Sequence, residues 1–192
     1  MNDFKLEPGD ILVTVNHRKD PFSRVKRWVA GPFEHVFMSL GKVRVITSPE
    51  QHQTLRFPLL FESNGRGAVI QALSNRYGQE VVILRLREEY RQGIPKVLKE
   101  AVKLASDKRG RYDYWCIVSF IIPRLLAQKL HLPLPSKYAR DPFMVCSEAV
   151  MEVFLRARVE VLPSSIVPLP GDFVDSPLLW FTWTGVLSEE LV

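Results

Sequence analysis

Cysteine is scarce in this 192-residue chain, which contains only Cys116 and Cys146. Two cysteines are too few for a disulfide framework or for a four-cysteine zinc site, so one bridge or two free thiols remain. The first ten residues carry charges where an export signal needs an apolar core. We therefore expect the chain to stay in a reducing compartment, with a Cys116–Cys146 disulfide the less favoured alternative.

Long apolar runs are also missing. The longest one, Tyr114–Ile122, is interrupted by Pro123 and Arg124, well short of the roughly 20 residues that a membrane-spanning helix needs. We predict a buried or interfacial helix in this stretch and no transmembrane segment.

Neither sign of charge is in large excess: 26 Lys and Arg face 21 Asp and Glu, which gives a net charge of +5. This surplus does not require an anionic partner, and no nucleic-acid recognition motif accompanies it, so we do not expect nucleic acid to bind. Basic residues gather in 18–27. That stretch is either a solvated face or a region that favours an anionic substrate or a membrane surface.

The residues that are present favour one α+β domain over 1–192. Hydrophobic residues make up 46% and charged residues 24%, which is enough to bury a core. β-Branched and apolar runs predict strands, and apolar residues at helical spacing predict helices. The expected strands are Ile11–Val15, His35–Leu40, Lys42–Thr47, Pro58–Ser63, Ala68–Leu73 and Glu80–Leu86. The expected helices are Ser23–Val29, one beginning at Pro95, Tyr114–Leu130 and Cys146–Arg158, followed by a loop-like tail with aromatic residues at Trp180, Phe181 and Trp183.

Three residues could carry nucleophilic chemistry. Cys146 opens a predicted helix, where unpaired N–H groups and the helix dipole favour the thiolate. His35 begins a predicted strand and Glu62 lies near the end of another, so neighbouring strands could place imidazole and carboxylate side by side. A thiol, a base and a group that orients the base are the components of cysteine catalysis.

Each of these residues also has an ordinary structural interpretation. Cys146 could be a small buried hydrophobic residue, His35 a core histidine and Glu62 a surface charge. Glu50 or His52 could take the third position instead of Glu62. The histidines show no spacing typical of a metal site, so we predict no metal and no cofactor.

Several motifs, in their order along the chain, resemble the circularly permuted branch of the NlpC/P60 papain-like superfamily, the YiiX/YebB-like group. Papain-like enzymes place Cys before His, whereas here the order is His, Glu, Cys. The resemblance covers about residues 6 to 180. It is carried by Pro8-Gly9-Asp10-Ile11-Leu12, Glu34-His35-Val36, Phe61-Glu62-Ser63, Gly67-Ala68-Val69, Arg111-Tyr112-Asp113, Val145-Cys146-Ser147-Glu148-Ala149-Val150 and Pro170-Gly171-Asp172-Phe173.

The resemblance implies a permuted papain-like fold, with a small antiparallel sheet packed on helices. It makes Cys146 the nucleophile, His35 the general base and Glu62 the residue that orients it, with Tyr112 lining the cleft. The implied activity is thiol hydrolysis of a peptide, cell-wall or acylated-amine substrate. Members of this group are often exported, and because this sequence shows no export signal we expect a cytoplasmic or phage-associated protein instead. The alternatives are an acyltransferase or phospholipase on the same fold, or a module that binds a lipid or acyl chain. If the protein binds a lipid, residues 115–126 and 180–183 would form the apolar wall of that binding site. The competing interpretation of both segments is ordinary core packing.

Overall fold

The structure is a computed structural model, and it describes residues 4–17, 31–48, 53–64, 67–107, 146–163 and 168–192. The predicted helices Ser23–Val29 and Tyr114–Leu130 lie outside these residues, as does the basic stretch 18–27.

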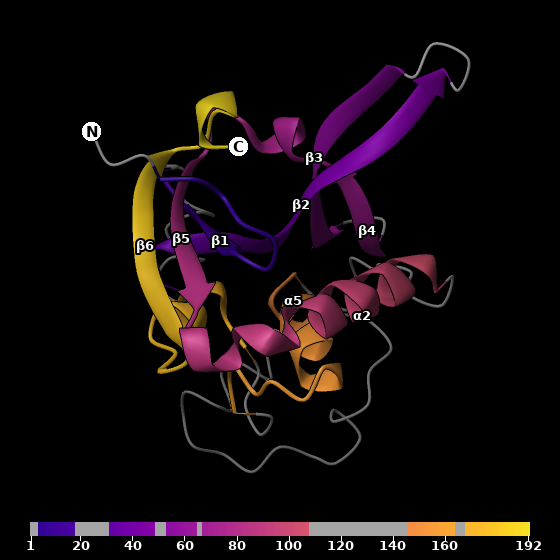
Figure 1. The fold of residues 1–192 in the computed structure, drawn as a ribbon. Coiled ribbons are helices and arrows are strands. Elements are labelled where there is room, and N and C mark those ends of the chain that lie inside the picture. Colours follow the sequence, from indigo (N-terminus) through magenta and orange to yellow (C-terminus); the bar gives the residue numbers. More distant parts are fainter. Residues whose placement is uncertain (1–3, 18–30, 49–52, 65–66, 108–145, 164–167) are drawn as a thin grey trace.

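Six strands form one antiparallel sheet in the order β4-β3-β2-β1-β5-β6. The strands are β1 (Ile11–Val15), β2 (Phe33–Ser48), β3 (Gln53–Asn64), β4 (Gly67–Ala72), β5 (Glu80–Leu86) and β6 (Leu179–Val186). Two helices, α2 (Ile94–Ser106) and α5 (Cys146–Arg156), pack against one face of this sheet (Figure 1). Short 3₁₀ helices connect these elements at η1 (Leu73–Arg76), η2 (Glu88–Gly93), η5 (Pro170–Phe173) and η6 (Glu189–Leu191). The described chain is therefore an α+β fold.

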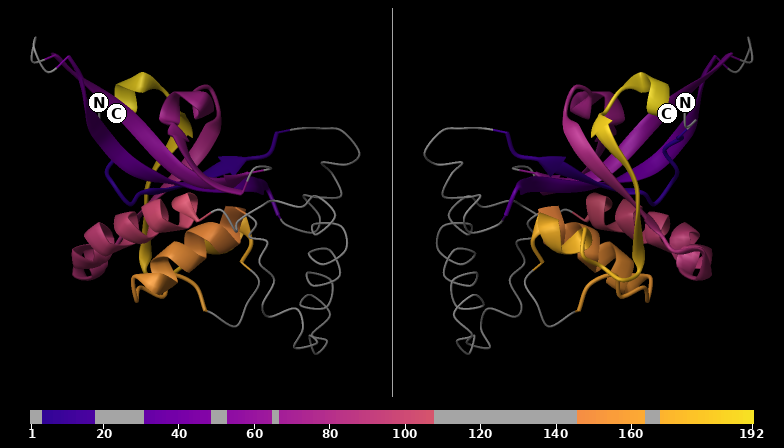
Figure 2. Two further views of the ribbon diagram at one scale, coloured as in Figure 1. Left: turned by 90° about the vertical axis from the view of Figure 1, so that its right-hand side faces the viewer. Right: turned by 90° about the vertical axis from the view of Figure 1, so that its left-hand side faces the viewer.

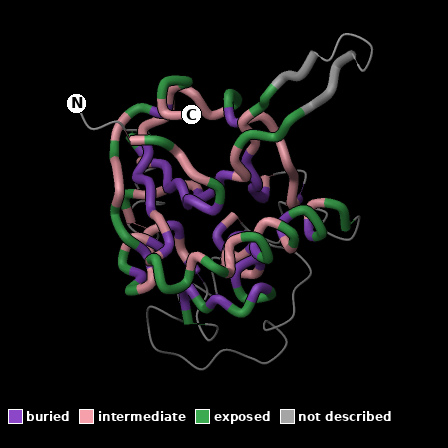
Figure 3. Tube along the Cα trace, in the orientation of Figure 1, coloured by how far each residue is buried: buried purple, intermediate pink, exposed green. Residues whose placement is uncertain are grey.

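The central strands are buried on both faces because two apolar clusters lie on opposite sides of the sheet. In β1, Ile11 and Val13 join the cluster shared with the helices, whereas Leu12 joins the second cluster with Phe37 and Leu60. This division follows the two-residue period of a strand. Figure 2 shows the strands curving above the two helices, and Figure 3 shows buried residues concentrated along the central strands.

Both described helices bury the apolar stripe that the sequence predicts. Val97, Ala101 and Leu104 are the buried residues of α2, which begins one residue before Pro95. α5 begins at Cys146 as predicted and ends at Arg156 rather than Arg158, because Arg158 adopts a left-handed backbone conformation with φ 67°. Among the described helices, none is long and apolar enough to cross a membrane.

The strands predicted at His35–Leu40 and Lys42–Thr47 are one continuous strand, β2. Gly41 lies between them at φ 77°, where the register with β3 shifts. A bulge of this kind bends a strand without ending it. The sequence predicts no strand between Thr47 and Pro58, and this is corrected as well. β3 begins at Gln53, and its first residues pair with the C-terminal half of β2; these paired segments form the β2–β3 arm.

The tail was expected to be loop-like, and this expectation is wrong for residues 179–186. They form β6, which pairs antiparallel with β5. Two leucines and then aromatic residues alternating with Thr, which favours strands, follow Pro177, the last proline of the tail. The aromatic cluster does not pack entirely in the core, because Trp180 and Phe181 are more than half exposed. Trp183 alone joins a core, stacking on Phe4 with ring centres 5.9 Å apart.

Candidate active site

Cys146 is the first residue of α5, and its thiol is free and partly buried. The apolar face of α5 holds this position, because Ala149, Val150 and Phe154 are fully buried against the sheet. The helix start is fixed further by Ser147, whose hydroxyl donates a 2.7 Å hydrogen bond to the Pro168 carbonyl. The sulfur therefore lies at a defined place, in the positive potential of a helix N-terminus.

His35 lies on β2 and forms a hydrogen bond with Cys146. The backbone there is paired with β1, where Thr14 lies opposite His35. The pairing of β2 with β3 begins only at Met38 and Phe61. Before that point β2 has no β3 partner, and the N–H of Val36 forms a hydrogen bond with the Cys146 sulfur. The site thus occupies the place where β2 and β3 separate and the start of α5 approaches them.

Glu62 lies on β3 with its side chain completely buried. His35 Nε2 is 2.8 Å from Glu62 Oε2. Because Nε2 donates to Glu62, Nδ1 is the ring nitrogen left for Cys146. The structure therefore brings together all three residues singled out in the sequence, with Glu62 as a partner of His35. Glu50 and His52 lie outside the described residues, as does Tyr112.

Four further contacts hold the Glu62 carboxylate. Oε1 accepts hydrogen bonds from Asn64 Nδ2 at 3.0 Å and Gln71 Nε2 at 2.6 Å. Oε2 accepts from Arg76 Nε at 3.0 Å and from the terminal Nη2 of Arg76 at 2.5 Å. With His35, five donor contacts surround one carboxylate, so its hydrogen-bonding capacity is satisfied.

Sequence reasoning missed Asn64, Gln71 and Arg76. Asn64 is two residues beyond Glu62 and shares its strand face, which the period of a strand would have predicted. Gln71 approaches Glu62 because β3 and β4 pair with Leu60 opposite Gln71, a register that no local pattern fixes. Arg76 ends the 3₁₀ helix η1 and gave no signal in the sequence.

The electrostatics of the site favour a thiolate and an imidazolium. Burial alone would raise the pKa of Cys146, but the charge and hydrogen bond of His35 and the N–H groups of Val36 and Ser147 lower it below its ordinary value. Burial likewise acts to lower the pKa of His35, yet Cys146 and Glu62 raise it to about 9. The pKa of Glu62 is lowered despite burial, mainly through His35, so the carboxylate stays ionised.

Comparisons with known proteins address the fold. No protein-family model matches the chain, and no curated protein matches it either. A solved structure does: the crystal structure of metalloprotein yiiX from Escherichia coli O157:H7, DUF1105, superposes with a TM-score of 0.59 at 16% identity. The match covers 96% of this chain and 100% of that one. The chain shares the fold of yiiX. The expected YiiX-like fold is thereby supported over nearly the full length.

The name of that structure raises the question whether the present site fits a metal ion. Among the described residues, no group of three or more His, Cys, Asp and Glu is arranged to hold one. At the candidate site, both oxygens of Glu62 already accept hydrogen bonds, and the guanidinium of Arg76 would repel a cation there. The donor set around Glu62 therefore does not fit a metal ion.

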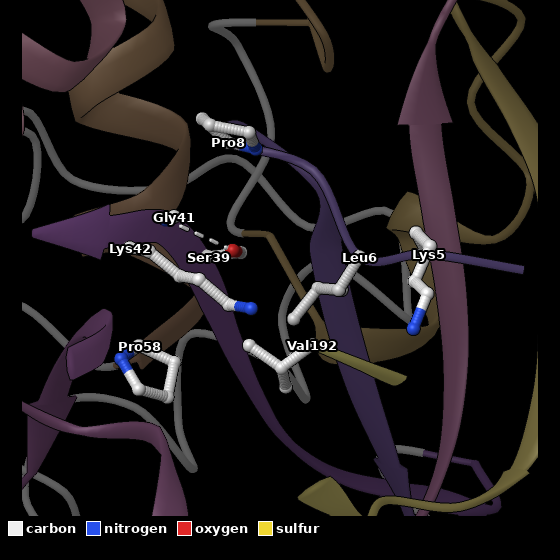
Figure 4. A pocket seen from close by; sticks show the side chains of 8 residues that line it. All are labelled: Lys5, Leu6, Pro8, Ser39, Gly41, Lys42, Pro58 and Val192. Atoms are coloured by element: carbon white, nitrogen blue, oxygen red, sulfur yellow. Dashed lines mark hydrogen bonds between the residues drawn. The ribbon is translucent and has the colours of Figure 1, made fainter. Parts of the chain in front are cut away.

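A cavity of about 370 Å³ lies away from this site, at the junction of the N-terminal segment and the base of the β2–β3 arm (Figure 4). None of its lining residues belongs to the Cys146, His35 and Glu62 cluster. They are Lys5, Leu6, Pro8, Ser39, Gly41, Lys42, Pro58 and Val192. The lining is mostly apolar, with two lysines at its edge.

Proposed function

We propose that the protein is a thiol hydrolase that cleaves an amide or related acyl bond through Cys146. The observation that carries the proposal is the chain of contacts from Cys146 to His35 and from His35 to Glu62. A thiol at a helix start, a base within hydrogen-bond reach and a buried orienting group are what an activated nucleophile requires. Together with the fold of yiiX and the order His, Glu, Cys, this supports a permuted papain-like enzyme of the NlpC/P60 type.

The proposed reaction has two steps. The Cys146 thiolate attacks the substrate carbonyl, forming an S–C bond, and the His35 imidazolium gives its proton to the departing amine as the C–N bond breaks. Water then attacks the thioester while His35 accepts one of its protons. The carboxylic acid leaves, and the Cys146 and His35 ion pair is restored.

The N–H groups at the sulfur also support this mechanism. Those of Val36 and Ser147 bond the Cys146 sulfur in the resting site. Backbone N–H groups at the start of a helix are suited to stabilise the oxyanion that forms during attack. We propose that the Cys146 amide takes this role, because an N–H in the first turn of a helix has no acceptor within that helix.

The first test is the rate of Cys146 alkylation by iodoacetamide across pH, read by peptide mass, with Cys116 as the comparison thiol in the same chain. Cys146 is expected to react with a midpoint well below the ordinary thiol pKa of about 8.5. In His35→Ala the midpoint should rise toward that ordinary value. A wild-type Cys146 that titrates as an ordinary thiol would remove the proposal.

The second test identifies the reaction. The protein is incubated with a panel of thioesters, acylated amines and short peptides, and intact mass reports the acyl group retained on Cys146. Cys146→Ala should gain no mass and release no product. Product analysis in the presence of an added amine acceptor then separates two outcomes: acyl transfer to the amine in preference to water indicates an acyltransferase, whereas the free acid alone indicates a hydrolase.

A second candidate function is suggested by the cavity near Lys5 and Lys42. Its volume of about 370 Å³ lies within the range of small-ligand sites, and its apolar walls with two edge lysines suit a short acyl chain ending in a carboxylate. Mass spectrometry of an organic extract, with titration of added fatty acid, tests this function. Absence of both co-purified lipid and fatty-acid binding would eliminate it.

A further inference from the structure

Arg76 is in contact with two members of the candidate catalytic cluster. Its Nε and Nη2 both donate to Glu62 Oε2, the oxygen that also accepts from His35. The same Nη2 lies 3.2 Å from His35 Nε2. On its other side the guanidinium lies over the Phe37 ring, 5.7 Å from the ring centre. Arg76 is thus fixed between a carboxylate and an aromatic ring.

This geometry constrains the histidine ring. A protonated Nε2 cannot accept a hydrogen bond from Arg76, so the ring and the guanidinium both direct their N–H groups at Glu62. The Arg76 contacts hold the position of that oxygen, and the oxygen in turn sets the direction of the His35 Nε2–H bond. The orientation of Nδ1 toward Cys146 follows from it.

Arg76 also changes the charge of the orienting group. A buried carboxylate alone would hold the proton on His35 strongly, which opposes its transfer to a departing amine. Glu62 paired with Arg76 carries no net charge. The pair then resembles in charge the neutral amide of a Cys-His-Asn arrangement.

We propose that Arg76 is a positioning residue for Cys146 and His35, acting through Glu62 to orient the imidazole and neutralise the carboxylate behind it. This inference rests on the proposed thiol chemistry for its purpose, although its measurement needs no substrate. The charged groups that meet here are Cys146 from α5, His35 from β2, Glu62 from β3 and Arg76 from η1.

The test compares the pH midpoint of Cys146 alkylation in the wild-type chain, Arg76→Met and Arg76→Lys. Removing a partly buried cation raises the pKa of every acid beside it, so the midpoint in Arg76→Met should move upward by about one pH unit. Arg76→Lys keeps the charge but loses the two-donor fork, so its midpoint should lie between the other two. If Arg76→Met does not fold, the test is the upward shift of the alkylation midpoint in Arg76→Lys relative to the wild-type chain.

Arg85→Met is a matched control. Arg85 also uses Nε and Nη2 on a buried carboxylate, that of Asp10, with both distances 2.8 Å. Its loss removes a similar ion pair without touching Cys146, His35 or Glu62, so the alkylation midpoint should stay at the wild-type value. A shift equal to that of Arg76→Met would show that general loosening is responsible, and would overturn the inference.

The outcomes separate the two proposals. An ordinary midpoint for wild-type Cys146 contradicts the proposed function itself. A low wild-type midpoint that is unchanged in both Arg76 variants leaves the thiol chemistry standing and rejects the role of Arg76 alone.

Discussion

At the scale of the residue, the most constrained group in the site is Glu62. Its carboxylate is fully buried and accepts from His35, Asn64, Gln71 and Arg76. A buried charge without partners would be strongly destabilising, and here two of the partners also carry charge or can do so. These contacts hold the ionised Glu62 carboxylate in a fixed position beside the His35 ring.

Glu62→Gln should lower the pKa of His35 from about 9 by at least about one unit, because both the hydrogen bond and the charge of Glu62 raise it. The substitution keeps the size of the side chain and leaves the charge of Arg76 unneutralised beside the ring, which acts in the same direction. Titration of the His35 ring protons by NMR, with the signal assigned from His35→Ala, measures the value.

Glu80→Gln is the matched control for that titration. Glu80 bonds another imidazole, that of His17, at 2.8 Å on the exposed surface. Its loss should leave the His35 titration in place. An unchanged His35 pKa in Glu62→Gln would mean that Glu62 orients the ring but does not stabilise its protonated form.

The three central residues were predictable from the sequence because each has its own local signal. Cys146 opens an apolar helical repeat, and His35 and Glu62 belong to apolar strands whose order makes them neighbours. The support from Arg76 was not predictable. It depends on how a 3₁₀ turn folds back over β3, which no periodicity encodes.

At the scale of the element, β2 links the site to the rest of the sheet. Its first half pairs with β1 and carries His35, and its second half pairs with β3. Gly41 lies at a shift in the β2–β3 register, and Pro8 packs directly over it: a Cβ built at Gly41 would lie 2.6 Å from the proline ring. A side chain at Gly41 would therefore be unfavourable for two reasons: the positive φ strains its backbone, and Pro8 occupies the space it needs.

Gly41→Ala should destabilise the fold by about 2 kcal/mol or more, combining the positive φ with overpacking against Pro8. Gly78→Ala isolates the first effect, because Gly78 has φ 84° and no atom within 4 Å of its added Cβ. We expect about 1 kcal/mol there. Urea unfolding of both variants measures the difference, and equal losses would contradict a role for Pro8.

Most strands were predictable from β-branched runs, whereas β2, β3 and β6 show where such runs fail. The polar stretch after Ser48 continues as β3 because it pairs with the arm of β2, and tertiary pairing overrides local composition. β6 follows several prolines, which favoured a loop in the sequence, and it pairs with the edge of β5.

At the scale of the whole molecule, the core and the site are coupled through α5. The same helix that presents Cys146 at its start buries Val150, Val153 and Phe154 beneath the sheet. His35 and Glu62 lie on the sheet that those residues contact. We therefore expect hydrophobic packing over a large interface, rather than one local bond, to set the distance between Cys146 and His35.

Phe154→Ala tests this coupling. Phe154 is completely buried, so its truncation should reduce the free energy of unfolding by about 3 to 5 kcal/mol. Leu155→Ala, one position further along the same helix and 38% exposed, should change it by less than about 1 kcal/mol. Chemical denaturation followed by tryptophan fluorescence gives both values.

The second measurement on these variants is the rate of Cys146 alkylation under conditions where each protein remains folded. If α5 packing holds the thiol against His35, the folded Phe154→Ala protein should lose part of the low-pH reactivity of Cys146, while Leu155→Ala keeps it. The cavity left by Phe154 lets the helix shift, and a small displacement weakens a hydrogen bond steeply. Reactivity unchanged in a folded but destabilised Phe154→Ala would show that the contacts of Ser147, Val36 and His35 at the helix start fix the thiol without the core.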